Sequence, residues 1–145
     1  MTSEISTRAI LVPLDVNSDH DRSRIFDLAE AEARMIGGRL VFLAVVPELY
    51  LATTTDPESL VAGMMDQAAR RLEAAVAARW PDPESAPRLV RYGPVAGEII
   101  DAAEETGAEL IMIRARRPGV ASYALGSVAS RVVNHAGASV YVVRG

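Results

Sequence analysis

The chain has 145 residues, half of them hydrophobic, and a formal net charge of -4 at a pI near 5.2. This length fits one globular domain over residues 1–145. The acidic balance argues against a general nucleic-acid-binding protein, the lack of cysteine excludes disulfides and thiolate catalysis, and two histidines are too few for a multi-histidine metal site. With no apolar run near about 18 residues and a polar N-terminus unlike a signal peptide, we expect a cytoplasmic protein without a membrane partner.

The first half of the chain predicts strand, helix, strand and helix in that order. Residues 8–14 form a nearly continuous apolar run, typical of a strand buried on both faces, and 39–46 repeat the pattern. Apolar residues at helical spacing predict a helix over 18–36. An Asp-Pro-Glu start predicts a second helix over 56–79, and residues 48–55 before it form an exposed connection. The predicted buried stripe of the second helix is Leu60, Met64, Ala68, Leu72 and Val76.

The second half continues the alternation. Residues 87–92 predict a more polar strand near a sheet edge, followed by a helix that ends at Gly107. Strands over 109–114 and 139–144 flank a helix that opens at Gly126. Alternating strands and helices indicate an α/β fold with a five-stranded, mainly parallel sheet and helices on both faces, which is Rossmann-like.

In such a sheet, ligands bind beyond the carboxyl ends of the strands, where the strand order reverses. The loops after Leu14, Val46 and Arg114 are therefore the candidate positions for a site. The loop over 115–125 returns through Gly126-Ser127 at a helix start, where backbone N–H groups can converge on an anion. The chain has no lysine, and the loop lacks the spacing of a Walker-type phosphate loop.

Several polar side chains near these loops have two readings each. Asp15 either hydrogen-bonds a ligand or is a turn residue, and Ser127 either donates to a phosphate or only caps its helix. The three arginines of the second loop either contact an anion or form a solvated loop. They are Arg114, Arg116 and Arg117.

Alternating polar residues from Asp15 to Asp21 resemble the start of a calcium loop. The pattern fails because His20 stands where the sharp-turn glycine belongs and Phe26 where the bidentate glutamate belongs. We therefore expect no metal site.

Taken in order, four stretches resemble the universal stress protein family over essentially the whole chain. They are AILVPLD, RLVFLAVVP, GPVAGEIIDAAEETGAELIMI and LGSVASRVVNHAGASVYVVR. The resemblance implies a single α/β nucleotide-binding-like domain of the stress response and, commonly, a homodimer through the last strands. An edge strand at the chain end could pair across a two-fold axis. The candidate interface residues are Val140, Tyr141, Val142 and Val143.

In the ATP-binding branch of this family, the phosphate loop follows G-x-x-G, nine residues, then G-[ST]. Counting back from Gly126-Ser127 puts the first two glycine positions at Ile113 and Arg116, so both glycines are missing. Ile113 is β-branched and stiff, whereas glycine allows close backbone approach to a ligand. Arg116 could still donate to phosphate through its guanidinium.

The resemblance leaves two functions open. The favoured one is a homodimeric regulatory or interaction protein that binds an unknown protein partner, is not of the usual ATP-binding type and is not an enzyme. The alternative is an adenine-nucleotide-binding protein with ATP or AMP and an arginine-containing phosphate loop; weak ATP hydrolysis stays open with it. By resemblance, Pro13, Leu14, Asp15 and Val45 match the adenine end, and Gly126, Ser127 and Val128 match the phosphate end. The other candidate site residues are Met112, Ile113, Arg114 and Arg116.

Overall fold

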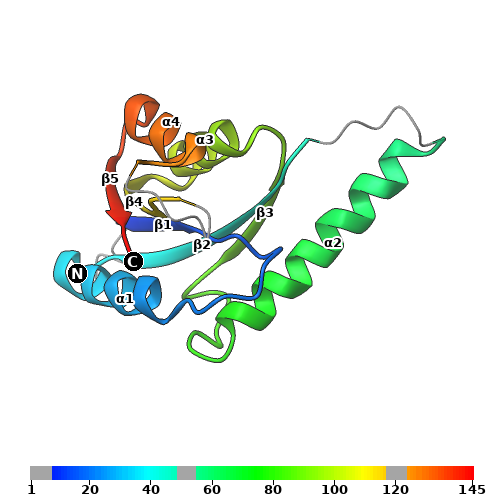
Figure 1. Cartoon of the computed structure of the whole chain (residues 1–145). Coiled ribbons are helices and arrows are strands. Elements are labelled where there is room, and N and C mark those ends of the chain that lie inside the picture. The colour runs from blue at the N-terminus through cyan, green and yellow to red at the C-terminus, as the bar shows by residue number, and fades with distance from the viewer. Residues whose placement is uncertain (1–7, 49–54, 117–123) are drawn as a thin grey trace.

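The computed structural model describes residues 8–48, 55–116 and 124–145, in which strands and helices alternate (Figure 1). The strands are β1 (Ala9–Pro13), β2 (Arg39–Val46), β3 (Arg88–Tyr92), β4 (Ala108–Arg114) and β5 (Ser139–Val143). The helices are α1 (Ser23–Ile36), α2 (Pro57–Val76), α3 (Val95–Thr106) and α4 (Ser127–His135).

The strands form one parallel sheet in the order β3-β2-β1-β4-β5. The order reverses beside β1, because the chain first adds β2 and β3 on one side and later β4 and β5 on the other. Helices α1 and α2 cover one face of the sheet, and α3 and α4 cover the other (Figure 1). The α/β fold with a parallel five-stranded sheet and helices on both faces is therefore confirmed.

The central strands are apolar throughout because both of their faces are covered. In β1, Ile10 and Val12 face α1 and α2, whereas Ala9 and Leu11 face α3 and α4. Each of these four side chains is fully buried. The edge strand β3 is only half-buried along its length, which agrees with its more polar sequence.

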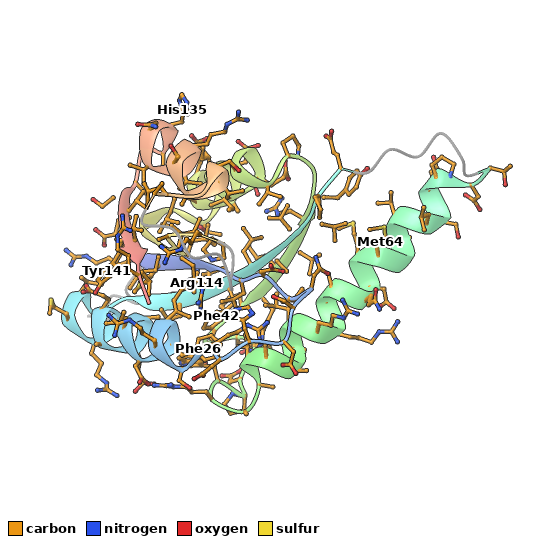
Figure 2. All side chains as sticks on the ribbon, in the orientation of Figure 1. Phe26, Phe42, Met64, Arg114, His135 and Tyr141 are labelled. Atoms are coloured by element: carbon orange, nitrogen blue, oxygen red, sulfur yellow. The ribbon has the colours of Figure 1, made fainter. Side chains whose placement is uncertain are left out.

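An aromatic cluster fills the core under α1 and α2. Phe26 of α1 packs edge-on against Phe42 of β2, with ring centroids 5.8 Å apart, and against Trp80 at 5.0 Å. Phe42 and Trp80 lie 4.8 Å apart. Figure 2 shows Phe26 and Phe42 on this side of the sheet. Edge-on aromatic pairs stabilise a core beyond their buried area, so this cluster contributes to the stability of this face.

Two predicted helix bounds are wrong. Helix α1 begins at Ser23, five residues later than predicted, because the Asp21 carboxylate accepts both the backbone N–H and the hydroxyl of Ser23 at 2.9 and 2.6 Å. Helix α2 starts as predicted, with the Asp56 carboxylate accepting the N–H of Ser59, but ends at Val76 rather than at 79. The last turn tightens there, since the Arg79 N–H donates to the Val76 carbonyl at 3.2 Å.

The predicted buried stripe of α2 is correct only in its second half. Ala68, Leu72 and Val76 are buried, whereas Leu60 is 42% exposed and Met64 is partly exposed. The helix is longer than the strands it packs on: 20 residues span about 30 Å as helix, against about 17 Å for the five of β3. Its first half therefore projects past the sheet, where Figure 2 places Met64.

Two predicted connections lie largely outside the described residues. The described residues leave out positions 49–54 of the predicted exposed connection. They also leave out positions 117–123 of the arginine-containing loop, which include Arg117.

Candidate functional site

A cavity of about 440 Å³ opens at the carboxyl ends of β1, β2 and β4, where the strand order reverses. It lies on the side of the sheet covered by α3 and α4. Parallel α/β sheets bind ligands at such a position, and the volume suits a small molecule. The lining residues are Pro13, Leu14, Asp15, Val16, Asn17, Leu43, Val45, Pro47, Val95, Ile99, Ile113, Arg114, Arg116, Gly126, Ser127, Val128 and Ala129.

One end of the cavity is apolar. Leu43 and Val45 of β2 lie opposite Val95 and Ile99 of α3, and Pro13 of β1 adjoins them. Strand residues two apart share a face, so the pattern of β2 places both of its side chains on this side of the sheet. This end can hold a flat apolar ring.

The other end of the cavity carries positive charge. Helix α4 begins here, and the first backbone N–H groups of a helix have no partner within it. Together with the helix dipole, they favour an anion. Helix α3 also begins at the cavity, with Val95 in its first turn, and Arg114 and Arg116 line the same space.

Gly126 allows the two ends of the loop before α4 to come together. Its φ of -64° is available to any residue, but a Cβ added there would lie 3.3 Å from the Arg116 Cα. The Gly126 N–H donates to the Ala115 carbonyl at 2.7 Å, which closes the loop. A side chain here would crowd the Arg116 backbone, so glycine favours the close approach, and its N–H already has a partner within the protein.

Arg114 points to the opposite side of β4 from Ile113, because successive strand residues alternate. Its Nη1 donates to the Asp21 carbonyl over a long 3.5 Å, and this is its one hydrogen bond to the described residues. Figure 2 shows Arg114 at the carboxyl edge of the sheet. Because Arg114 is the last residue of β4, it still lines the cavity at this edge, and its single long hydrogen bond leaves other donors of the guanidinium for a ligand.

The loop between β1 and α1 is held by hydrogen bonds to its oxygens. Arg22 Nη2 donates to the carbonyls of Asp15 and Ser18 at 2.8 and 3.1 Å, and the Asn17 N–H donates to Asp15 Oδ1 at 2.9 Å. Burial lowers the pKa of Arg22, although the charge of Asp15 opposes this change. Burial and the Arg22 charge also lower the pKa of His20 in the same loop.

Ten of the eleven predicted site residues line this one cavity; nucleotide contact by them stays a prediction. Met112 does not line it: its side chain is fully buried on the other face of the sheet, in the cluster with Ile10 and Phe42. The alternation along β4 explains this, since Ile113 faces the cavity and Met112 must then face away.

The predicted interface strand β5 lies at the sheet edge, paired with β4. Val140, Tyr141 and Val142 are half-buried, but Val143 is buried in the core. Its side chain is therefore not available at a surface.

The sequence analysis missed the contribution of α3, and it named the loops after Leu14 and Val46 without the residues Val16, Asn17 and Pro47. In a parallel sheet, every following helix starts at the carboxyl edge, so the first turn from Val95 to Ile99 carried a usable signal. The missed lining residues are Val16, Asn17, Leu43, Pro47, Val95, Ile99 and Ala129.

Comparisons with known proteins agree with the α/β fold described above. The model of the Usp: Universal stress protein family matches residues 6–144. Universal stress protein G from Shigella flexneri is 38% identical over 81 residues, which are 56% of this chain and 57% of the relative. The match thus spans little more than half the length of such curated relatives.

Solved structures match over more of the chain. The universal stress protein UspA from Lactobacillus plantarum superposes with a TM-score of 0.76 at 26% identity and covers 95% of this chain and 98% of its own. A universal stress protein from Archaeoglobus fulgidus in complex with dAMP has a TM-score of 0.57 at 23% identity, covering 93% and 96%. Within the described ranges, no helix is long and apolar enough to cross a membrane. The family model extends over nearly every residue of the fold, and the chain belongs to the universal stress protein family.

Proposed function

We propose that this protein binds an adenine nucleotide, ATP or AMP, in the cavity at the carboxyl ends of β1, β2 and β4. One observation carries the proposal: a single cavity combines an apolar end with a cationic end at a helix N-terminus. A nucleotide has the matching halves, a flat base and an anionic phosphate. Of the two functions that the sequence leaves open, the cavity favours this one.

The base fits between Val45 of β2 and Val95 of α3, with Asp15 at its edge. An ionised carboxylate only accepts hydrogen bonds, so Asp15 suits the amino group of adenine. The phosphate fits at the start of α4, where Ser127 and Arg114 supply donors. Two structural relatives at 23% and 18% identity are complexes with dAMP and cAMP, which supports this ligand class.

Calorimetric titration tests the proposal. AMP, ADP and ATP with magnesium are titrated into purified protein, after mass spectrometry has shown that no nucleotide co-purified. We expect micromolar binding, weakened about tenfold in Arg114→Gln, since hydrogen bonds to charged groups contribute about 1.5–3 kcal/mol. Arg131→Gln on the exposed side of α4 is the matched control and should bind like the parent protein. No heat from any nucleotide, with no ligand co-purified, would disprove nucleotide binding.

A second function, partner binding without nucleotide, is favoured by the loop itself. Ile113 is only 6% exposed where the ATP-binding branch has glycine, and the Gly126 N–H is already bonded to Ala115. Fewer backbone donors then remain for a phosphate chain. If no nucleotide binds in the titration, the function to test is interaction with an unidentified protein partner, without catalysis.

In either case we infer a homodimer through β5. The strand lies at an edge, and an unpaired edge can pair with a second copy across a two-fold axis. Sedimentation should show a dimer that Tyr141→Lys dissociates, because charge on an edge strand disfavours edge pairing. Met35→Lys on α1, at a side chain that is 78% exposed, is the control and should leave the dimer intact. A monomeric parent protein contradicts the inference.

A further inference from the structure

Arg71 lies on α2, outside the cavity, but contacts one of the residues that line it. Its Nη1 donates to Asn17 Oδ1 at 3.3 Å, which links α2 to the loop between β1 and α1. Helix α2 otherwise packs on β2 and β3. This hydrogen bond therefore connects the loop at the cavity mouth to a helix on the other face of the sheet.

Asn17 in turn contacts Asp15. The Asn17 N–H donates to Asp15 Oδ1 at 2.9 Å, so the position of Asn17 fixes the orientation of the Asp15 carboxylate. The backbone of Asp15 is held separately, because Arg22 donates to its carbonyl at 2.8 Å. Asp15 Oδ2 makes no hydrogen bond to the described residues. One carboxylate oxygen is thus held by the loop while the other stays available to a ligand.

Arg70, the neighbour of Arg71, provides a natural comparison. Both side chains are exposed on α2, but Arg70 forms an ion pair with Asp66 one turn earlier on the same helix. Arg71 forms no ion pair with the described residues, and its hydrogen bond goes to the cavity loop. The two adjacent arginines therefore differ in their partners: Arg70 binds within its own helix, and Arg71 binds the cavity loop.

We propose that Arg71 is a positioning residue that orients the Asp15 carboxylate through Asn17 and so determines the preference of the site for a base with an exocyclic amino group. This inference rests on the proposed nucleotide binding. Adenine presents an amino donor to the carboxylate, whereas hypoxanthine presents a carbonyl oxygen at the same position. Two facing acceptors repel, so a fixed carboxylate rejects hypoxanthine and a loosened one rejects it less.

The test compares AMP with IMP by titration against the parent protein, Arg71→Gln and Arg70→Gln. We expect the parent protein to prefer AMP, and Arg71→Gln to lower the AMP-to-IMP affinity ratio about threefold to tenfold, the range of one hydrogen bond. Arg70→Gln should keep the ratio of the parent protein. A general loss of stability would weaken both nucleotides together and leave the ratio unchanged.

A double-mutant cycle with Asn17→Ala tests whether Arg71 acts through Asn17. If it does, Arg71→Gln lowers the ratio no further once Asn17 is alanine. Independent, additive losses would overturn the proposal, as would an unchanged ratio in Arg71→Gln or a parent protein that binds AMP and IMP equally. A parent protein that binds neither nucleotide overturns the proposed function and this inference with it, whereas binding with an unaltered ratio overturns this inference alone.

Discussion

The two faces of the sheet are built from different side chains. Beneath α1 and α2, the rings of Phe26, Phe42 and Trp80 interlock. Beneath α3 and α4, the buried residues are aliphatic or small, with Ala102 and Ala103 bringing α3 close to the sheet. The cavity lies on this second side. Large rings fill the core on one face, while the other face, with smaller side chains, carries the site.

Loss of a ring from the aromatic face should have the largest effect. Phe42→Ala removes a fully buried ring that touches two others, so the free energy of unfolding should fall by about 3–5 kcal/mol. Urea unfolding measures this. The nucleotide affinity of the folded fraction should not change, since Phe42 faces away from the cavity; a selective loss of binding would show that the two faces are coupled.

Two leucines on α2 allow its packed second half to be compared with its projecting first half. Leu72→Ala should destabilise the fold by about 2–5 kcal/mol because its side chain is fully buried. Leu60→Ala, at a position 42% exposed, should stay within about 0.5 kcal/mol. Equal losses in urea unfolding would mean that the first half of α2 is covered in solution.

Filling the cavity should affect binding more than stability. Val45→Phe places a ring in the apolar end of the cavity, where space exists, so we expect at least about tenfold weaker nucleotide binding, or about 1.4 kcal/mol. The free energy of unfolding should change by less than about 1.5 kcal/mol, as for other tolerated apolar exchanges. Calorimetry and urea unfolding of the same preparation distinguish the two quantities, and unchanged affinity would place the ligand elsewhere.

The smallest expected effect is a pH dependence at the mouth of the cavity. Burial, then the charge of Arg22, lowers the pKa of His20 below its ordinary value of 6.5, with Arg114 adding to this and Ser18 and Asp15 opposing it. The unfolded chain therefore takes up this proton first, so stability is fully present above about pH 6.5 and falls as the pH drops toward the folded pKa.

Urea unfolding between pH 8 and 5 of the parent protein and of His20→Gln measures this contribution. The variant should lose less stability over that range. Asp21, whose pKa is lowered from 3.8, loses its contribution only below that value and does not interfere. A greater loss in the variant would reverse the sign that we expect.

Local patterns explain why much of the site could be predicted. Alternating strands and helices predict a parallel sheet whose carboxyl ends share one edge, so the loops after Leu14 and Arg114 could be expected at that edge. The structure shows that the strand order reverses there. The error at Met112 has a different cause: the sequence does not state which face of a buried strand a given helix covers. In an apolar run such as that of β4, the residues on the two faces of the strand have similar polarity, so the pattern does not identify the face toward the cavity.

The sequence by itself determined the order of the elements, the Asp56 start of α2 and the edge position of β3, because caps, periodicity and polarity act over a few residues. Only the tertiary structure decided that the first half of α2 projects past the sheet and that Arg71 donates a hydrogen bond to Asn17. These outcomes depend on relative lengths and on contacts between residues far apart in the chain. Burial and long-range hydrogen bonds are properties of the assembled layers, and no local pattern encodes them.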